Sequence, residues 1–122
     1  MAPLSLNDKF EKTILSNLIY NEEFARKAIP FLKEVFFKDR IETIVFQQIN
    51  NFVVKYNNLP TKEALTIELS NLKNITEEEF KQSKQLLNSL DVESNVDQKW
   101  LLDTTEKFCK DRAVYNAVLK VI

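Results

Sequence analysis

Several residues have types and spacing that could support chemistry, beginning with an acidic segment near position 95. The side chains that alternate there like the ligands of a calcium-binding loop are Asp91, Glu93, Asn95 and Asp97. However, Val96 occupies the position where such a loop requires Gly, and Leu102 the position of its bidentate Glu. We therefore expect no calcium site, and an acidic cluster at the start of a helix explains these residues better.

Two candidate nucleophiles lack the partners that their chemistry needs. Ser70 and Lys73 match the Ser-x-x-Lys pattern, but the partner motifs Ser-Asp-Asn and Lys-Thr-Gly are absent from the sequence. Cys109 has Lys110 and Arg112 nearby, which could lower the pKa of its thiol. With no His to act as a base, we expect Cys109 to be a small buried apolar residue instead.

The composition excludes most catalytic classes, because the 122 residues include no Gly and no His. Walker A loops, Rossmann fingerprints and nucleophile elbows need backbone conformations that Gly supplies most cheaply. Without His, the Ser-His triads and most zinc sites are excluded. A single Cys excludes an internal disulfide and is typical of a reducing compartment. The length corresponds to one domain.

Charge and hydropathy point to a soluble protein without a nucleic-acid footprint. Seventeen basic residues oppose 18 acidic ones, for a net charge of −1. The acidic bias between positions 63 and 97 could attract a basic partner, but a solvated helix surface is the more common explanation. No apolar run approaches the roughly 18 residues that a membrane span needs. Residues 1–5 also lack the features of a signal peptide, so we expect a cytoplasmic protein.

The periodicity predicts helices throughout, since tight hairpins favour turn residues such as Gly. One long amphipathic helix is predicted over residues 39–56, with Asp39 as its cap. Its apolar stripe consists of Ile41, Ile44, Val45, Ile49, Phe52, Val53 and Tyr56.

Local signals place the other helices. Thr76 and Glu79 form a capping box that opens a helix towards Leu90, and Pro60-Thr61 starts a short helix through Leu72. Two further helices are expected over residues 10–19 and 22–32, the second kinking or stopping near Pro30. Residues 35–37 are expected to form a buried turn. The predicted fold is therefore an all-α compact bundle of five to six helices ending in a long helix.

The last segment, from about residue 95 to residue 122, contains no helix breaker. From Ala113 onward its apolar residues surround the helix on all sides, so this end must be buried on all sides. Either a partner subunit covers it, or the chain stops in mid-element, or its own bundle buries it. We divide the single domain into a globular bundle, residues 1–95, and the long helix, residues 96–122. Acidic residues interleave with the basic residues of this helix and predict a salt-bridged face.

A recognisable string lies in the same segment. Its elements are Trp100-Leu101, Thr105-Glu106-Lys107, Phe108, Arg112-Ala113, Tyr115 and Asn116-Ala117. With residues 14–19 and the helix start at Leu59-Pro60-Thr61, this string resembles the N-terminal domain of DnaB-type replicative helicases, in the form found in T-even phages. The resemblance covers about residues 13–122.

The resemblance implies an all-α bundle followed by a helical hairpin, with residues 100–122 as its first arm. In that family this domain is the non-motor tier of a hexameric ring, and a separate RecA-like domain uses ATP and Mg²⁺ to unwind DNA. The partners implied are other copies in the ring, primase and a helicase loader within the primosome, in the host cytoplasm if the protein is phage-encoded. No Walker A loop or arginine finger can be placed here, so we expect no catalytic, cofactor-binding or metal-binding residue in this chain, and the motor domain to be absent.

The leading hypothesis is thus a non-catalytic assembly and partner-docking module of a replicative helicase. The alternatives are a stand-alone helical adaptor or helicase-loader protein, and a weak single-stranded nucleic-acid-binding module. The residues expected at the subunit interface or in the hairpin core are Trp100, Leu101, Phe108, Tyr115, Val118, Leu119 and Ile122.

Overall fold

The computed structural model describes the backbone of residues 2–92 and 96–121, and the side chains of residues 10–92 and 96–121. Over these residues the chain forms six α-helices and one turn of 3₁₀ helix, with no strand, which confirms the predicted all-α bundle. The helices are α1 (Ala2–Tyr20), α2 (Glu22–Ala28), α3 (Arg40–Tyr56), α4 (Lys62–Ser70), α5 (Glu77–Ser89) and α6 (Gln98–Val121). The 3₁₀ turn, η1 (Glu34–Phe36), lies between α2 and α3.

The boundary between α1 and α2 depends on Asn21. Its side chain accepts a hydrogen bond from the backbone N–H of Phe24 and so caps α2. Helix α2 then ends at Ala28, two residues before Pro30, as the position of that proline predicts. Leu32, which we expected inside this helix, follows it in a loop, where its side chain is buried.

Helix α3 is the centre of the bundle and packs against α1, α4 and α5. Asp39 caps it by accepting a hydrogen bond from the N–H of Ile41, and the predicted stripe buries Ile44 and Ile49. The helix ends at Asn57, whose φ of 51° is in the left-handed region. Asn tolerates this conformation better than most residues, so it takes the role that Gly usually has at a helix end.

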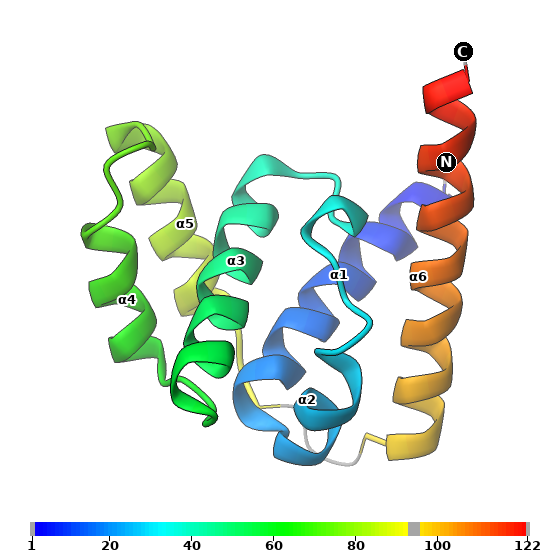
Figure 1. Ribbon diagram of the computed structural model, residues 1–122, viewed down its shortest axis with the longest axis horizontal. Helices are drawn as coiled ribbons and strands as arrows, with labels where there is room; N and C mark the ends of the chain where they lie inside the picture. Colours follow the sequence, from blue (N-terminus) through cyan, green and yellow to red (C-terminus); the bar gives the residue numbers. More distant parts are fainter. Residues whose placement is uncertain (1, 93–95, 122) are drawn as a thin grey trace.

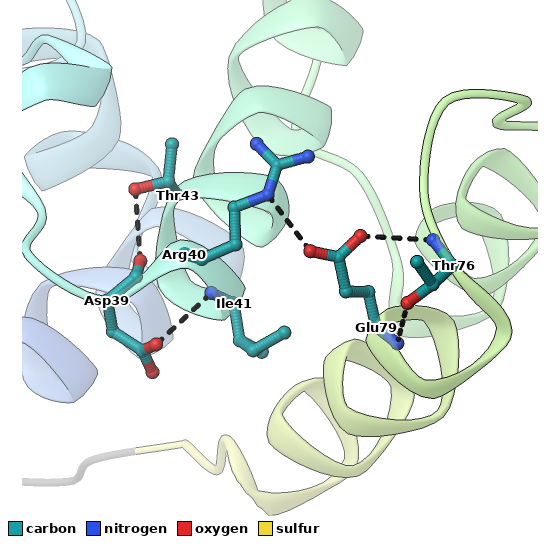
Figure 2. A network of polar contacts seen from close by, with 6 residues as sticks. All are labelled: Asp39, Arg40, Ile41, Thr43, Thr76 and Glu79. Carbon is teal, nitrogen blue, oxygen red and sulfur yellow. Dashed lines mark hydrogen bonds and ion pairs between the residues drawn. The ribbon is translucent and has the colours of Figure 1, made fainter.

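A polar network joins the starts of α3 and α5 (Figure 2). Thr76 and Glu79 form the predicted capping box, each side chain bonding the backbone N–H of the other at 3.0 Å. Glu79 also accepts a hydrogen bond from Nε of Arg40 at 3.2 Å. Local capping and contact between helices are therefore achieved by one carboxylate.

The helices are arranged so that α6 lies at one edge of the bundle and the α4–α5 pair at the other (Figure 1). Helix α6 packs against α2 and η1, and its last turns project past the neighbouring helices. One apolar core runs through all the helices, from Leu69 of α4 to Leu101 of α6. No described helix is long and apolar enough to cross a membrane.

Candidate protein–protein interface

The first half of α6 is part of the bundle core. Leu101 is fully buried, and Phe108 and Cys109 are nearly so. The ring of Phe108 lies 5.9 Å from that of Phe10 in α1 and 6.3 Å from that of Phe37, which follows η1. These contacts attach α6 to two segments that are distant from it in sequence.

A buried ion pair lies one turn beyond Phe108. Nη2 of Arg112 donates to Oε1 of Glu11 in α1 at 2.6 Å, and the two side chains are 8% and 1% exposed. The guanidinium also lies over the ring of Phe108, 5.0 Å from its centroid. Arg112 therefore belongs to the core-facing side of α6 and not to the solvated basic face where we expected it.

The outer side of the same half is charged and solvated. Lys99 pairs with Asp103 and Lys107 with Asp111, each at 2.9 Å and four residues apart. The carboxylate of Asp103 raises the pKa of Lys99. These pairs confirm the salt-bridged face predicted for this helix, and they neutralise Lys99 and Lys107, two of the basic residues that could contact a phosphate backbone.

The second half of α6 is different, because its apolar side chains are exposed. The exposed apolar end, as we call it, comprises Val114, Tyr115, Val118, Leu119 and Val121. Val114 is 65% exposed and Val121 87%, and the other three are each more than half exposed. The proposal that this chain's own bundle buries the end is therefore wrong for the described residues. Figure 1 shows the end extending beyond α1 and α3.

Helical spacing arranges these side chains on two faces. Tyr115 and Leu119 continue the core-facing stripe of Leu101 and Phe108, whereas the three valines share a face on the far side of the helix. Asn116 lies on the flank of the stripe away from the valines and donates from Nδ2 to the backbone oxygen of Val35 at 3.0 Å. The helix thus continues its apolar pattern beyond the point where the bundle can cover it.

The structure divides the seven residues predicted for the interface or hairpin core. Tyr115, Val118 and Leu119 are exposed, as an interface requires. Trp100 is exposed at the other end of α6, with its ring against that of Phe10 at 6.1 Å. We correct the placement of Leu101 and Phe108, which lie in this domain's own core: Leu101 is fully buried there, and rings from α1 and from the segment after η1 pack on Phe108. Ile122 lies outside the described residues.

Three residues of this region had no place in the predicted interface. Val114 and Val121 belong to the same all-apolar stretch from Ala113 onward that pointed to Tyr115, Val118 and Leu119. Glu11 gave no signal of its own, because its partner is 101 residues away. The only hint was a charged Arg112 lying on an otherwise apolar stripe.

The candidate chemical groups have structural roles where they are described. Burial, with a smaller effect of Glu106, raises the pKa of the Cys109 thiol to about 11, the opposite of an activated nucleophile. Asp97 accepts a hydrogen bond from the N–H of Trp100 at the start of α6, and Asp91 is exposed. Glu93 and Asn95 lie outside the described residues. The part of the chain that is described contains no cluster of three or more potential metal ligands.

Comparison with known proteins gives one informative similarity. No protein-family model matches the chain. The chain is, however, 33% identical over 109 residues to the DnaB-like replicative helicase of Enterobacteria phage T4. The resemblance to DnaB-type replicative helicases is confirmed. The matched region is 89% of this chain but only 22% of the T4 helicase, so the chain spans about a fifth of the length of that relative.

Proposed function

We propose that this chain is a non-catalytic assembly and partner-docking module of a phage replicative DNA helicase. The similarity to the T4 helicase supports a helicase-related role in DNA replication. The observation that carries the assembly role is the exposed apolar end of α6, since five large apolar side chains in two helical turns are unusual on a monomer surface.

The physical basis of docking is the removal of these side chains from water. Burying one fully contributes about 1.5–3 kcal/mol, so several together can offset the entropy lost on association. The partner that we propose first is another copy of the chain, as in the ring of a DnaB-type helicase. Primase and a helicase loader are further proposed partners, which would dock on the same tier.

We propose no catalytic role for these 122 residues. A Walker A loop needs Gly to let its backbone approach the phosphates, and the sequence has no Gly. The residues present therefore do not fit an ATP–Mg²⁺ site. In this proposal ATP binding and hydrolysis belong to a motor domain elsewhere in the helicase.

Sedimentation velocity of the full chain over a concentration series tests the assembly role. We expect concentration-dependent self-association, and Val118→Asp should weaken it at least about tenfold because a charge replaces a buried methyl pair. Val54→Asp is the matched control, because Val54 is also exposed but lies in the last turn of α3, whereas α6 packs on α2 and η1. A wild-type chain that stays monomeric at all concentrations, or equal effects of the two substitutions, would contradict the proposal.

The nucleic-acid alternative has no observation in its favour. The described lysines Lys99 and Lys107 are paired with carboxylates, and the net charge is −1. A titration with single-stranded DNA should show weak or no binding at physiological salt. Tight binding with a steep salt dependence would favour that alternative.

A further inference from the structure

We propose that the ion pair between Glu11 and Arg112 is an orientation lock, which fixes the direction in which the exposed end of α6 leaves the bundle. This inference is independent of whether that end is the docking surface proposed above. The ion pair acts within one copy of the chain and sets how α6 is oriented on the bundle.

The pair is located where attachment of α6 to the bundle ends. The described residues of α6 that are buried are Leu101, Thr105, Phe108, Cys109 and Arg112. After Arg112, the one hydrogen bond described from α6 to another element is the exposed bond from Nδ2 of Asn116 to the backbone oxygen of Val35 in η1. A rotation of α6 about its last core contact would therefore move every apolar side chain from Val114 to Val121.

Stability alone does not explain why two charged side chains, Glu11 and Arg112, occupy this buried contact between α1 and α6. Arg112 lies on the stripe that holds Leu101 and Phe108, where an apolar side chain would pack without removing two charges from water. Replacing a buried ion pair by apolar residues is often neutral or stabilising, because the desolvation cost rivals the attraction. A buried ion pair can instead favour one arrangement of two helices over others, as a buried polar residue fixes the register of a coiled coil.

The contacts around the pair constrain α6 in two ways. The 2.6 Å bond to Glu11 fixes the distance to α1, and the stacking of the guanidinium on Phe108 restricts the rotation of the Arg112 side chain. Apolar side chains at both positions would accept several tilts of similar energy. The lock therefore determines which face of the exposed end points away from the bundle.

Distance measurements between spin labels test this inference. The labels are placed at Lys120→Cys in α6 and Lys84→Cys in α5, two exposed positions, in the full chain with Cys109→Ala. The intact pair should give one narrow distance distribution. In Glu11→Leu/Arg112→Met we expect a broad or shifted distribution, while Tm stays within about 5 °C of the parent.

Breaking the exposed pair Lys107–Asp111 with Lys107→Gln/Asp111→Asn is the control, and its distribution should remain narrow. An unchanged narrow distribution in Glu11→Leu/Arg112→Met would overturn the proposal. So would a large fall in Tm or a failure of that variant to fold, because the pair would then supply stability and not direction. Diluting the labelled chain with an excess of unlabelled chain removes distances between copies, so these results do not depend on self-association, which the sedimentation experiment measures separately.

Discussion

At the scale of single residues, the contacts of Phe108 explain why half of α6 belongs to the core. Phe108 contacts rings from α1 and from the segment after η1, and it carries the guanidinium of Arg112 on its face. The sequence identified Phe108 as an apolar residue of the last helix and placed it at the subunit interface or in the hairpin core. It could not show that residues 10 and 37 supply its neighbours, because side-chain periodicity describes one helix and not what packs on it.

Truncating Phe108 should therefore damage the fold and not only an interface. We expect Phe108→Ala to lower the free energy of unfolding by about 3–5 kcal/mol through the cavity that it leaves. Val114→Ala, at an exposed position of the same helix, should change it by no more than about 0.5 kcal/mol. Urea unfolding monitored by circular dichroism measures both, and similar values for the two variants would contradict the assignment of Phe108 to the core.

The thiol of Cys109 should be inert in the folded chain. Burial raises its pKa to about 11, so the thiolate fraction at pH 8 is on the order of 100-fold smaller than for an ordinary Cys thiol. Alkylation by iodoacetamide should be slower than in the urea-unfolded chain by at least this factor. Equal rates in the two states would show that the thiol is accessible and unperturbed.

At the scale of helices, short-range signals in the sequence were sufficient. The capping box of Thr76 and Glu79, the cap at Asp39 and the helix start after Pro60 each involve residues within four positions of one another. Such contacts are visible without knowledge of the fold. The link from Glu79 to Arg40, 39 residues away, depends on how α3 and α5 pack and could not be predicted from spacing.

The capping network predicts a pH dependence of stability. The backbone N–H of Thr76, and then Arg40, lower the pKa of Glu79 below its ordinary 4.5. Because the folded-state pKa is the lower one, the stabilisation by Glu79 is present above the unfolded-state pKa and is lost as pH falls through the folded-state value. Glu79→Gln should therefore lower Tm at pH 7 and have a much smaller effect near pH 2.5. A Tm difference that stays constant from pH 7 to pH 2.5 would show that the charge of Glu79 is not involved.

Contacts between residues far apart in the sequence could not be predicted, either for the fold or for the candidate interface. The apolar surround after Ala113 singled out this helix end, because an all-apolar helix surface is recognisable in sequence, but it left open whether the chain's own bundle buries it. The structure excludes burial by the bundle for the described residues. The position along α6 where core becomes surface was not predictable, since it is set by Glu11 of α1. Leu101 and Phe108 were assigned to the interface or hairpin core for this reason.

At the scale of the whole molecule, one edge of the bundle is incomplete. The α4–α5 edge presents mainly polar and charged side chains, while the opposite edge ends in the exposed apolar end of α6 (Figure 1). In the function that we propose, other copies of the chain cover this end. We propose that residues 113–121 become buried when copies of the chain associate.

Amide hydrogen exchange of the full chain at increasing protein concentration measures that burial directly. We predict that exchange in residues 113–121 slows as concentration rises, while α3 and α4 exchange at unchanged rates. Exchange rates in residues 113–121 that are independent of concentration, or protection that appears on α4 and α5 instead, would contradict the claim.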